Sequence, residues 1–313
     1  MSGLDDPQVI ELLKTRFVCV ALDVWYEQRR DDGAGAFYRT VVGQRRDLDP
    51  ERSTQGFYVS TVGGGLLRYW NNRDPQRIRQ HLEAALAKQP ARSVAIVTDR
   101  DHAVDPRLAR PVPDGAAVVD VFARILDASS DDGESCDVRW PAGDRWQTKL
   151  HGSIGRDHLW ILPDEIDALA HGEVPDALLM RIARFHLVDN TRGEPPLWTR
   201  REVKRAAARL VPISADRPGC FRLDGHVELS TADLSRGDSV DLLGEVVVRD
   251  GRLVCFDVVG SGTCHGESTY TPGAPRGKFP LAFAMRIAAD DAIARDVPPQ
   301  GARDLADYLR AVK

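Results

Sequence analysis

Residues 240–260 read VDLLGEVVVRDGRLVCFDVVG, and this stretch decides the fold of the C-terminal part of the chain. Two apolar runs flank the pair Asp250-Gly251, and an Asp-Gly pair in that position is typical of a two-residue type I′ turn. The stretch therefore predicts an antiparallel β-hairpin. Both faces of that hairpin carry apolar side chains, so we expect its strands to lie centrally in a β-sandwich or barrel.

The turn also sets the expected register of the two strands. Counting outward from a two-residue turn pairs Val246 with Cys255 and Gly244 with Asp257. Asp257 then falls on a largely apolar face, opposite a residue that has no side chain. A carboxylate in such a place needs hydrogen bonds or a cation, or else its pKa rises. Asp257 is therefore a candidate catalytic residue.

Periodic patterns extend the prediction to the rest of the C-terminal part. Alternation and short apolar runs predict further strands at 117–126, 185–188, 221–229 and 279–287. Helical spacing predicts helices over 163–170, 175–182, 199–210 and 301–312. We expect a β-rich domain with helical insertions over 115–313, joined to a first domain at 1–98 by a proline- and charge-rich linker at 99–114.

The first domain carries three patterned segments. FVCVALD at 17–23 predicts a buried strand, with Cys19 as a small core residue, GFYVSTVGGGLLRYW at 56–70 predicts a hairpin, and DPQRIRQHLEAAL at 74–86 predicts an amphipathic helix. This order of elements is similar to the back half of the thioredoxin-like superfamily, over about residues 5–89. The resemblance implies a thioredoxin-like α/β first domain, and the whole chain is expected to be α+β.

The resemblance lacks the chemistry of that superfamily. The chain contains no Cys-x-x-Cys pair, and residues 53–56, about where the resemblance places a cis-proline, include no proline. It therefore implies a redox-inactive domain that is not a dithiol–disulfide oxidoreductase. The opening strands of the fold have no counterpart before residue 5, and the β-prone segment SVAIVT at 93–98 is the candidate for the missing strand.

Composition excludes several classes of function. The chain has 313 residues and a net charge of −5, which argues against general nucleic-acid binding because that requires a basic surface. No basic and apolar leader and no run of about 18 apolar residues is present, so we expect a cytoplasmic protein that does not bind membranes. Five widely spaced cysteines are typical of free thiols in a reducing compartment.

Two groups of side chains carry candidate chemistry. Asp224, His226 and Glu228 alternate along one face of a predicted strand, where they could offer nitrogen and oxygen ligands to a divalent metal ion; the alternative is an ordinary solvated face. Cys264 and His265 suggest a thiol–imidazole pair, although neighbours on an extended chain point to opposite faces.

These observations favour a binding or scaffolding protein that holds a protein partner or a small molecule in its β-rich domain. The alternative is a metal-dependent or hydrolytic enzyme with a site built from Asp224, His226, Glu228, Asp257 and His265. A third hypothesis is a thiol-based activity centred on Cys264.

Overall fold

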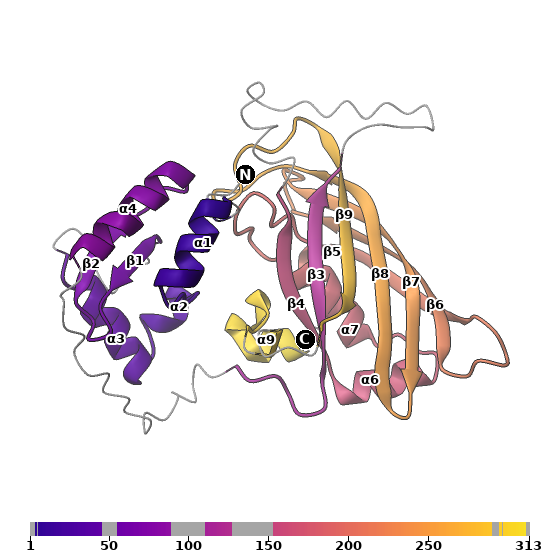
Figure 1. The fold of residues 1–313 in the computed structure, drawn as a ribbon. Coiled ribbons are helices and arrows are strands. Elements are labelled where there is room, and N and C mark those ends of the chain that lie inside the picture. The colour runs from indigo at the N-terminus through magenta and orange to yellow at the C-terminus, as the bar shows by residue number, and fades with distance from the viewer. Residues whose placement is uncertain are drawn as a thin grey trace. The chain divides into compact units, whose positions relative to one another are not determined.

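The computed structural model describes residues 4, 6–45, 55–88, 110–126, 153–289, 294–295 and 297–310. The chain divides into two compact units, Met1–Ala109 and Arg110–Lys313, which are described separately (Figure 1). The strand expected at 93–98 lies outside the described residues, as does most of the linker expected at 99–114. In the described part of the chain, no helix is long and apolar enough to cross a membrane.

The N-terminal unit consists of short helices and a two-stranded sheet. Its elements are α1 (Pro7–Arg16), α2 (Val24–Glu27), α3 (Gly33–Val42), β1 (Phe57–Ser60), β2 (Leu66–Trp70) and α4 (Pro75–Lys88). Strands β1 and β2 pair antiparallel, and Ile78 and Leu82 of α4 share a buried cluster with Val9 and Trp70. The predicted hairpin and the predicted closing helix are thus both confirmed.

The strand expected at 17–23 is wrong. This segment joins α1 to α2 outside any strand, with Val18 95% exposed and Val20 70% exposed, and Cys19 is exposed too rather than part of a core. An apolar run forms a buried strand only where a neighbouring strand takes up its backbone hydrogen bonds. In the described part of this unit, β1 and β2 pair with each other and leave no such neighbour. The thioredoxin-like resemblance stays a prediction.

The C-terminal unit is built on one seven-stranded sheet. Its strands are β3 (Ala117–Ile125), β4 (Gly155–Ile161), β5 (Val203–Pro212), β6 (Cys220–Ser230), β7 (Gly237–Arg249), β8 (Arg252–His265) and β9 (Lys278–Ile287). Its helices are α6 (Pro163–Ala170), α7 (Asp176–Arg181), a π-helix (Ile182–His186), 3-10 turns (Arg200–Glu202 and Gln300–Asp304) and α9 (Leu305–Arg310). The strand order is β4-β3-β9-β8-β7-β6-β5, with antiparallel neighbours throughout.

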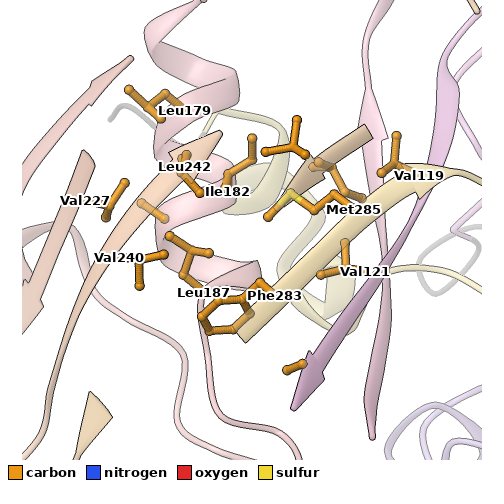
Figure 2. Close-up of a cluster of buried hydrophobic side chains, with 14 of the residues drawn as sticks. Val119, Val121, Leu179, Ile182, Leu187, Val227, Val240, Leu242, Phe283 and Met285 are labelled. Atoms are coloured by element: carbon orange, nitrogen blue, oxygen red, sulfur yellow. The ribbon is translucent and has the colours of Figure 1, made fainter. Parts of the chain in front are cut away.

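The sheet is open, with β4 and β5 as its edges, so the expected sandwich or barrel is corrected to a single sheet. Helices α6 and α7 cover one face (Figure 1). Leu179, Ile182 and Leu187 of the helical segment pack against Val240 and Phe283 of the sheet (Figure 2). A helical layer buries an apolar sheet face as well as a second sheet would. The α+β class is confirmed.

Two secondary-structure predictions in this unit are wrong. Residues 199–210 were expected to be helical, but most of them form β5, because pairing with β6 outweighs the helix propensity of an alanine- and arginine-rich segment. Residues 185–188 were expected to form a strand, but α7 continues through the π-helix Ile182–His186. An apolar run this short does not distinguish a buried helix from a strand.

The predicted hairpin forms, but with a different register. Asp250 and Gly251 both have positive φ, 50° and 70°, as a type I′ turn requires. A β-bulge near Val254 then pairs Val247 with Cys255 and Glu245 with Asp257. A bulge adds one residue to one strand, which reverses the inward and outward alternation beyond it. Asp257 is consequently exposed to solvent, not placed on an apolar face.

The C-terminal helix α9 is held to this unit by buried polar contacts. The Tyr308 hydroxyl accepts a hydrogen bond from the Trp160 backbone N–H at 3.2 Å and lies 3.0 Å from His186 Nε2. Arg181 donates to the Tyr308 carbonyl at 3.0 Å and forms an ion pair with Glu165 at 2.7 Å. These contacts join α6, α7 and α9 inside the fold.

Candidate functional site

The predicted row Asp224, His226 and Glu228 lies on the outer face of β6, as the alternation predicted. His226 Nδ1 lies 2.6 Å from Asp241 Oδ1 on β7, and His226 Nε2 lies 3.1 Å from Glu228 Oε1. The hydrogen bond to Asp241 raises the pKa of His226, and the bond to Glu228 adds to the shift, while partial burial opposes it. The imidazole is thus a bridge between two carboxylates.

This row shows no metal geometry. Both nitrogens of His226 face carboxylates, whereas a metal ligand must offer a free nitrogen lone pair. Asp224 lies instead 3.7 Å from Arg209. Among the residues that the structure describes, no group of three or more His, Cys, Asp or Glu side chains is arranged to hold a metal ion.

The five-residue enzyme site does not assemble. Asp257 and His265 lie on the same strand eight residues apart, which is about 27 Å in an extended chain. Asp257 pairs opposite Glu245, and His265 pairs opposite Gly237, with its Nε2 3.2 Å from the Leu234 carbonyl. The sheet therefore keeps these two side chains at opposite ends of β8.

Cys264 points to the inner face of the sheet and meets a carboxylate that the sequence analysis missed. Strand pairing places Leu229, Asp238, Cys264 and Phe279 side by side across β6 to β9. Asp238 and Cys264 are both buried, 5% and 3% exposed. The carboxyl group of Asp238 and the thiol of Cys264 are thus buried next to each other at one end of the apolar core.

Asp238 is the most perturbed carboxyl group of the described residues. Burial raises its pKa from 3.8 to about 7, and Asp189 adds to the shift, while the nearby Cys264 thiol and the charges of Arg236 and Arg192 oppose it. Its Oδ1 is buried and has no hydrogen-bond partner in the described part of the chain. A carboxyl group in this state exchanges its proton close to neutral pH.

The same environment makes Cys264 a poor nucleophile. Burial raises the pKa of the Cys264 thiol well above its ordinary value, and the neighbouring Asp238 raises it further. The thiolate is the nucleophilic form of cysteine, and a thiol held protonated is inert. His265 lies on the opposite face of the strand, so it does not activate the thiol.

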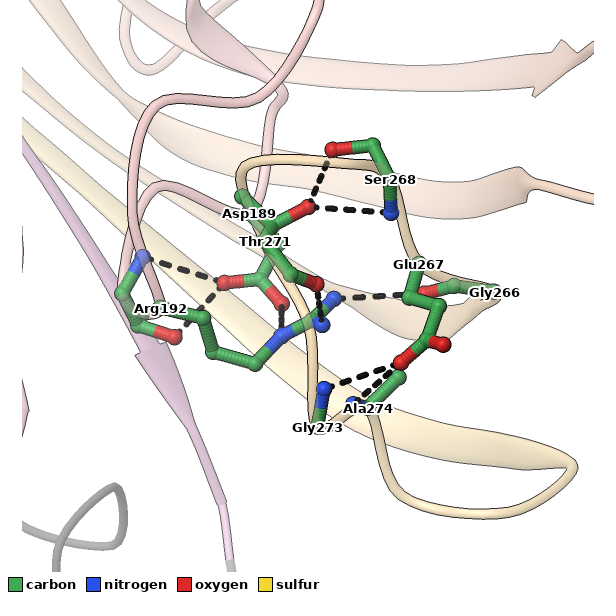
Figure 3. A network of polar contacts seen from close by, with 9 residues as sticks. Asp189, Arg192, Gly266, Glu267, Ser268, Thr271, Gly273 and Ala274 are labelled. Carbon is green, nitrogen blue, oxygen red and sulfur yellow. Dashed lines mark hydrogen bonds and ion pairs between the residues drawn. The ribbon is translucent and has the colours of Figure 1, made fainter.

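An ion pair forms one wall around Asp238. Arg192 Nε lies 2.8 Å from Asp189 Oδ2, and Arg192 also donates to the backbone carbonyls of Thr271 and Gly266 (Figure 3). The second oxygen of Asp189 accepts hydrogen bonds from the backbone and hydroxyl of Thr191. This wall is thus a fully bonded network.

A stacked cation forms another part of the lining. The Arg236 guanidinium lies 3.8 Å from the ring centroid of Trp198 and donates to the Pro196 carbonyl at 2.7 Å. The enclosed cavity has a volume of about 10 Å³, which is room for about one water molecule. The acid can therefore hold a proton and a water, but it has no space for a substrate.

A much larger cavity lies at the turn end of the hairpins. A groove of about 820 Å³ is lined by residues 216–220 before and in β6, by residues 248–251 at the β7–β8 turn and by Ala170. Arg217 and Arg249 line it with Asp216 and Asp250. Among the described residues, neither guanidinium makes a hydrogen bond or an ion pair through its side chain.

The burial of Asp238 could have been predicted from the alternation of its strand. Asp238 precedes Val240 and Leu242 by two and four residues, so alternation places its carboxyl group on their buried face. The groove is harder to predict. The sequence indicates the two turns that line it, but it does not indicate that these turns lie side by side.

Comparison with known proteins adds no assignment: no family model, no curated protein and no solved structure matches this chain.

Proposed function

We propose that the chain is a binding protein whose ligand site is the groove at the turn end of the C-terminal sheet. The observation that carries the proposal is the groove itself, whose volume of about 820 Å³ falls in the range of small-molecule sites. Two arginines line it whose guanidinium groups have no partner among the residues that the structure describes, and a guanidinium binds carboxylate or phosphate groups through paired hydrogen bonds. The ligand is therefore a small molecule with an acidic group.

The carboxylates that line the groove further restrict the chemical class of the ligand. Asp216 and Asp250 line the same cavity as Arg217 and Arg249, so a polyanion would meet repulsion there. A ligand that combines one acidic group with hydrogen-bond donors would satisfy both kinds of side chain. The turns that carry these residues join β5 to β6 and β7 to β8, so paired strands of the sheet support the groove.

Two observations favour binding over catalysis. The candidate enzyme residues Asp257 and His265 lie far apart, and the acid with a pKa near neutrality, Asp238, is enclosed with space for about one water molecule. The N-terminal unit has Cys19 as its one cysteine, so it has no dithiol for disulfide exchange. We propose that this unit, redox-inactive, contributes a docking surface.

The groove is tested by ligand-observed NMR with a library of small carboxylates and phosphate esters. We expect hits whose Kd for the full chain rises at least about tenfold, or about 1.4 kcal/mol, in Arg217→Ala or Arg249→Ala. Arg205→Ala is the matched control, because Arg205 is an exposed arginine on β5 that pairs opposite Glu228, outside the groove. Hits that bind all three variants equally, or a library without hits, would overturn the proposal.

A further inference from the structure

A short segment covers the buried acid. Residues 266–277, which we call the strap, join the end of β8 to the start of β9. Three of its glycines, Gly266, Gly273 and Gly277, have φ between 75° and 90°, a backbone conformation that side chains disfavour. Two of these glycines are the first and last residues of the strap.

The strap is bonded to itself between those ends. The Ser268 N–H donates to Thr271 Oγ1 at 3.2 Å, and the Glu267 carboxylate accepts from the N–H groups of Gly273 and Ala274 at 2.9 and 3.3 Å (Figure 3). These internal hydrogen bonds help the strap to keep its shape.

The Arg192 side chain bonds the strap over the cavity, and Ala274 of the strap packs in the apolar core. Arg192 donates to the carbonyls of Thr271 and Gly266, and its ion pair with Asp189 holds the guanidinium in place. Gly266 and Thr271 also line the small cavity next to Asp238. The closed position of the strap therefore depends on the hydrogen bonds that the Arg192 guanidinium donates to it.

Charged and titratable groups face Asp238 from each element packed around it. Arg236 directly precedes β7, which carries Asp238, while Asp189 and Arg192 come from the segment after the π-helix and Cys264 from β8. Glu202 acts on Arg236 from the 3-10 turn before β5. Arg192 both donates hydrogen bonds to the strap and acts through its charge on Asp238.

We propose that the strap is a proton-controlled lid, closed while Asp238 is protonated and loosened when Asp238 ionises. Two effects act in the same direction. An ionised carboxylate requires more hydration than a cavity for about one water supplies, and its Oδ1 has no protein partner among the described residues. Its charge also competes with the strap carbonyls for the Arg192 guanidinium.

The experiment is hydrogen exchange of the full chain, followed by mass spectrometry on peptides covering the strap, from pH 5.5 to 8.5. After correction for intrinsic exchange rates, strap opening should increase by up to about tenfold per pH unit from pH 5.5 to about pH 7 and then level off, and at every pH it should exceed the opening of the centre of β7. In Asp238→Asn the strap should exchange equally at every pH. Asp257→Asn, an exposed carboxylate on β8, is the matched control and should behave as the wild type.

A second variant keeps the test decisive if Asp238→Asn does not fold. Arg192→Gln removes the fastening charge, so strap exchange should be fast at every pH. Carbon NMR of the Asp238 carboxyl group in the wild type should titrate at the pH where the rise in strap exchange levels off. Strap exchange that does not depend on pH in the wild type, or that rises equally in Asp238→Asn, would overturn the proposal.

Discussion

The carboxyl group of Asp238 keeps its proton in the folded chain up to about pH 7, whereas its ordinary pKa is 3.8. Between these values the unfolded state binds fewer protons than the folded state, so the free energy of unfolding falls as the pH rises. The slope is about 1.4 kcal/mol per pH unit, which amounts to about 4 kcal/mol in all. The loss is complete above about pH 7.

Urea denaturation at pH 5 and pH 8 measures this effect. Between these conditions the wild type should lose about 3 kcal/mol more stability than Asp238→Asn, because the amide does not titrate. Asp257→Asn should show the wild-type loss, since Asp257 is exposed. The assignment fails if the wild type and Asp238→Asn lose equal stability over this range.

His226 gives a second prediction for a single residue. Its pKa is raised above 6.5, chiefly by the hydrogen bond to Asp241, so the protonated imidazole stabilises this face at low pH and the effect fades as the pH rises through the raised pKa. In NMR titrations of the imidazole, Asp241→Asn should lower this pKa more than Glu228→Gln does. A larger effect from Glu228→Gln would contradict the geometry.

Single residues also show how far sequence alone reaches. Alternation correctly predicted that Asp224, His226 and Glu228 share an outer face, because all three belong to one strand. Their partners Asp241 and Arg209 come from neighbouring strands, and pairing of distant strands cannot be read from a local pattern. Asp238 was within reach of the same alternation, but Asp189, Arg192 and Trp198 around it were not.

At the scale of elements, the buried ion pair between Arg181 and Glu165 joins α7 to α6 and supports α9. Arg181 is fully buried, so removal of Glu165 leaves a buried charge without its partner. Glu165→Ala should lower the free energy of unfolding by about 3–5 kcal/mol.

Asp307→Ala is the matched control for this ion pair. Asp307 pairs with Arg184, but the Asp307 side chain is 39% exposed and water reaches the pair, so its removal should cost less than the removal of Glu165. Chemical denaturation of both variants gives the comparison, and similar losses in the two would argue against a structural role for the buried pair.

Elements were predicted well where local signals agreed with the fold. The inward stripe Val119, Val121, Ala123 and Ile125 of β3 is buried as expected, and the type I′ turn forms at Asp250-Gly251. Strand β5 was missed because its alanines and arginines favour a helix when considered alone. The strand conformation of β5 follows from its pairing with β6, which the local sequence of β5 does not indicate.

At the scale of the whole molecule, the α+β class followed from the pattern of elements, but the number of sheet layers did not. Apolar residues on both faces of β7 and β8 predicted a second sheet, yet Leu243 and Val259 remain 57% and 53% exposed on the outer face. Alternation shows which residues share a face of a strand. Whether a helix, a second sheet or solvent lies against that face depends on elements elsewhere in the chain.

The bulge near Val254 has an effect at the far end of its strand. Without that one extra residue, β8 would present Asp257 to the interior and turn Cys264 toward solvent. The Cys264 thiol therefore points toward Asp238 because of the bulge at Val254, ten residues earlier in the strand. One extra residue in β8, not the chemistry around the cavity, therefore determines that the Cys264 side chain contacts Asp238.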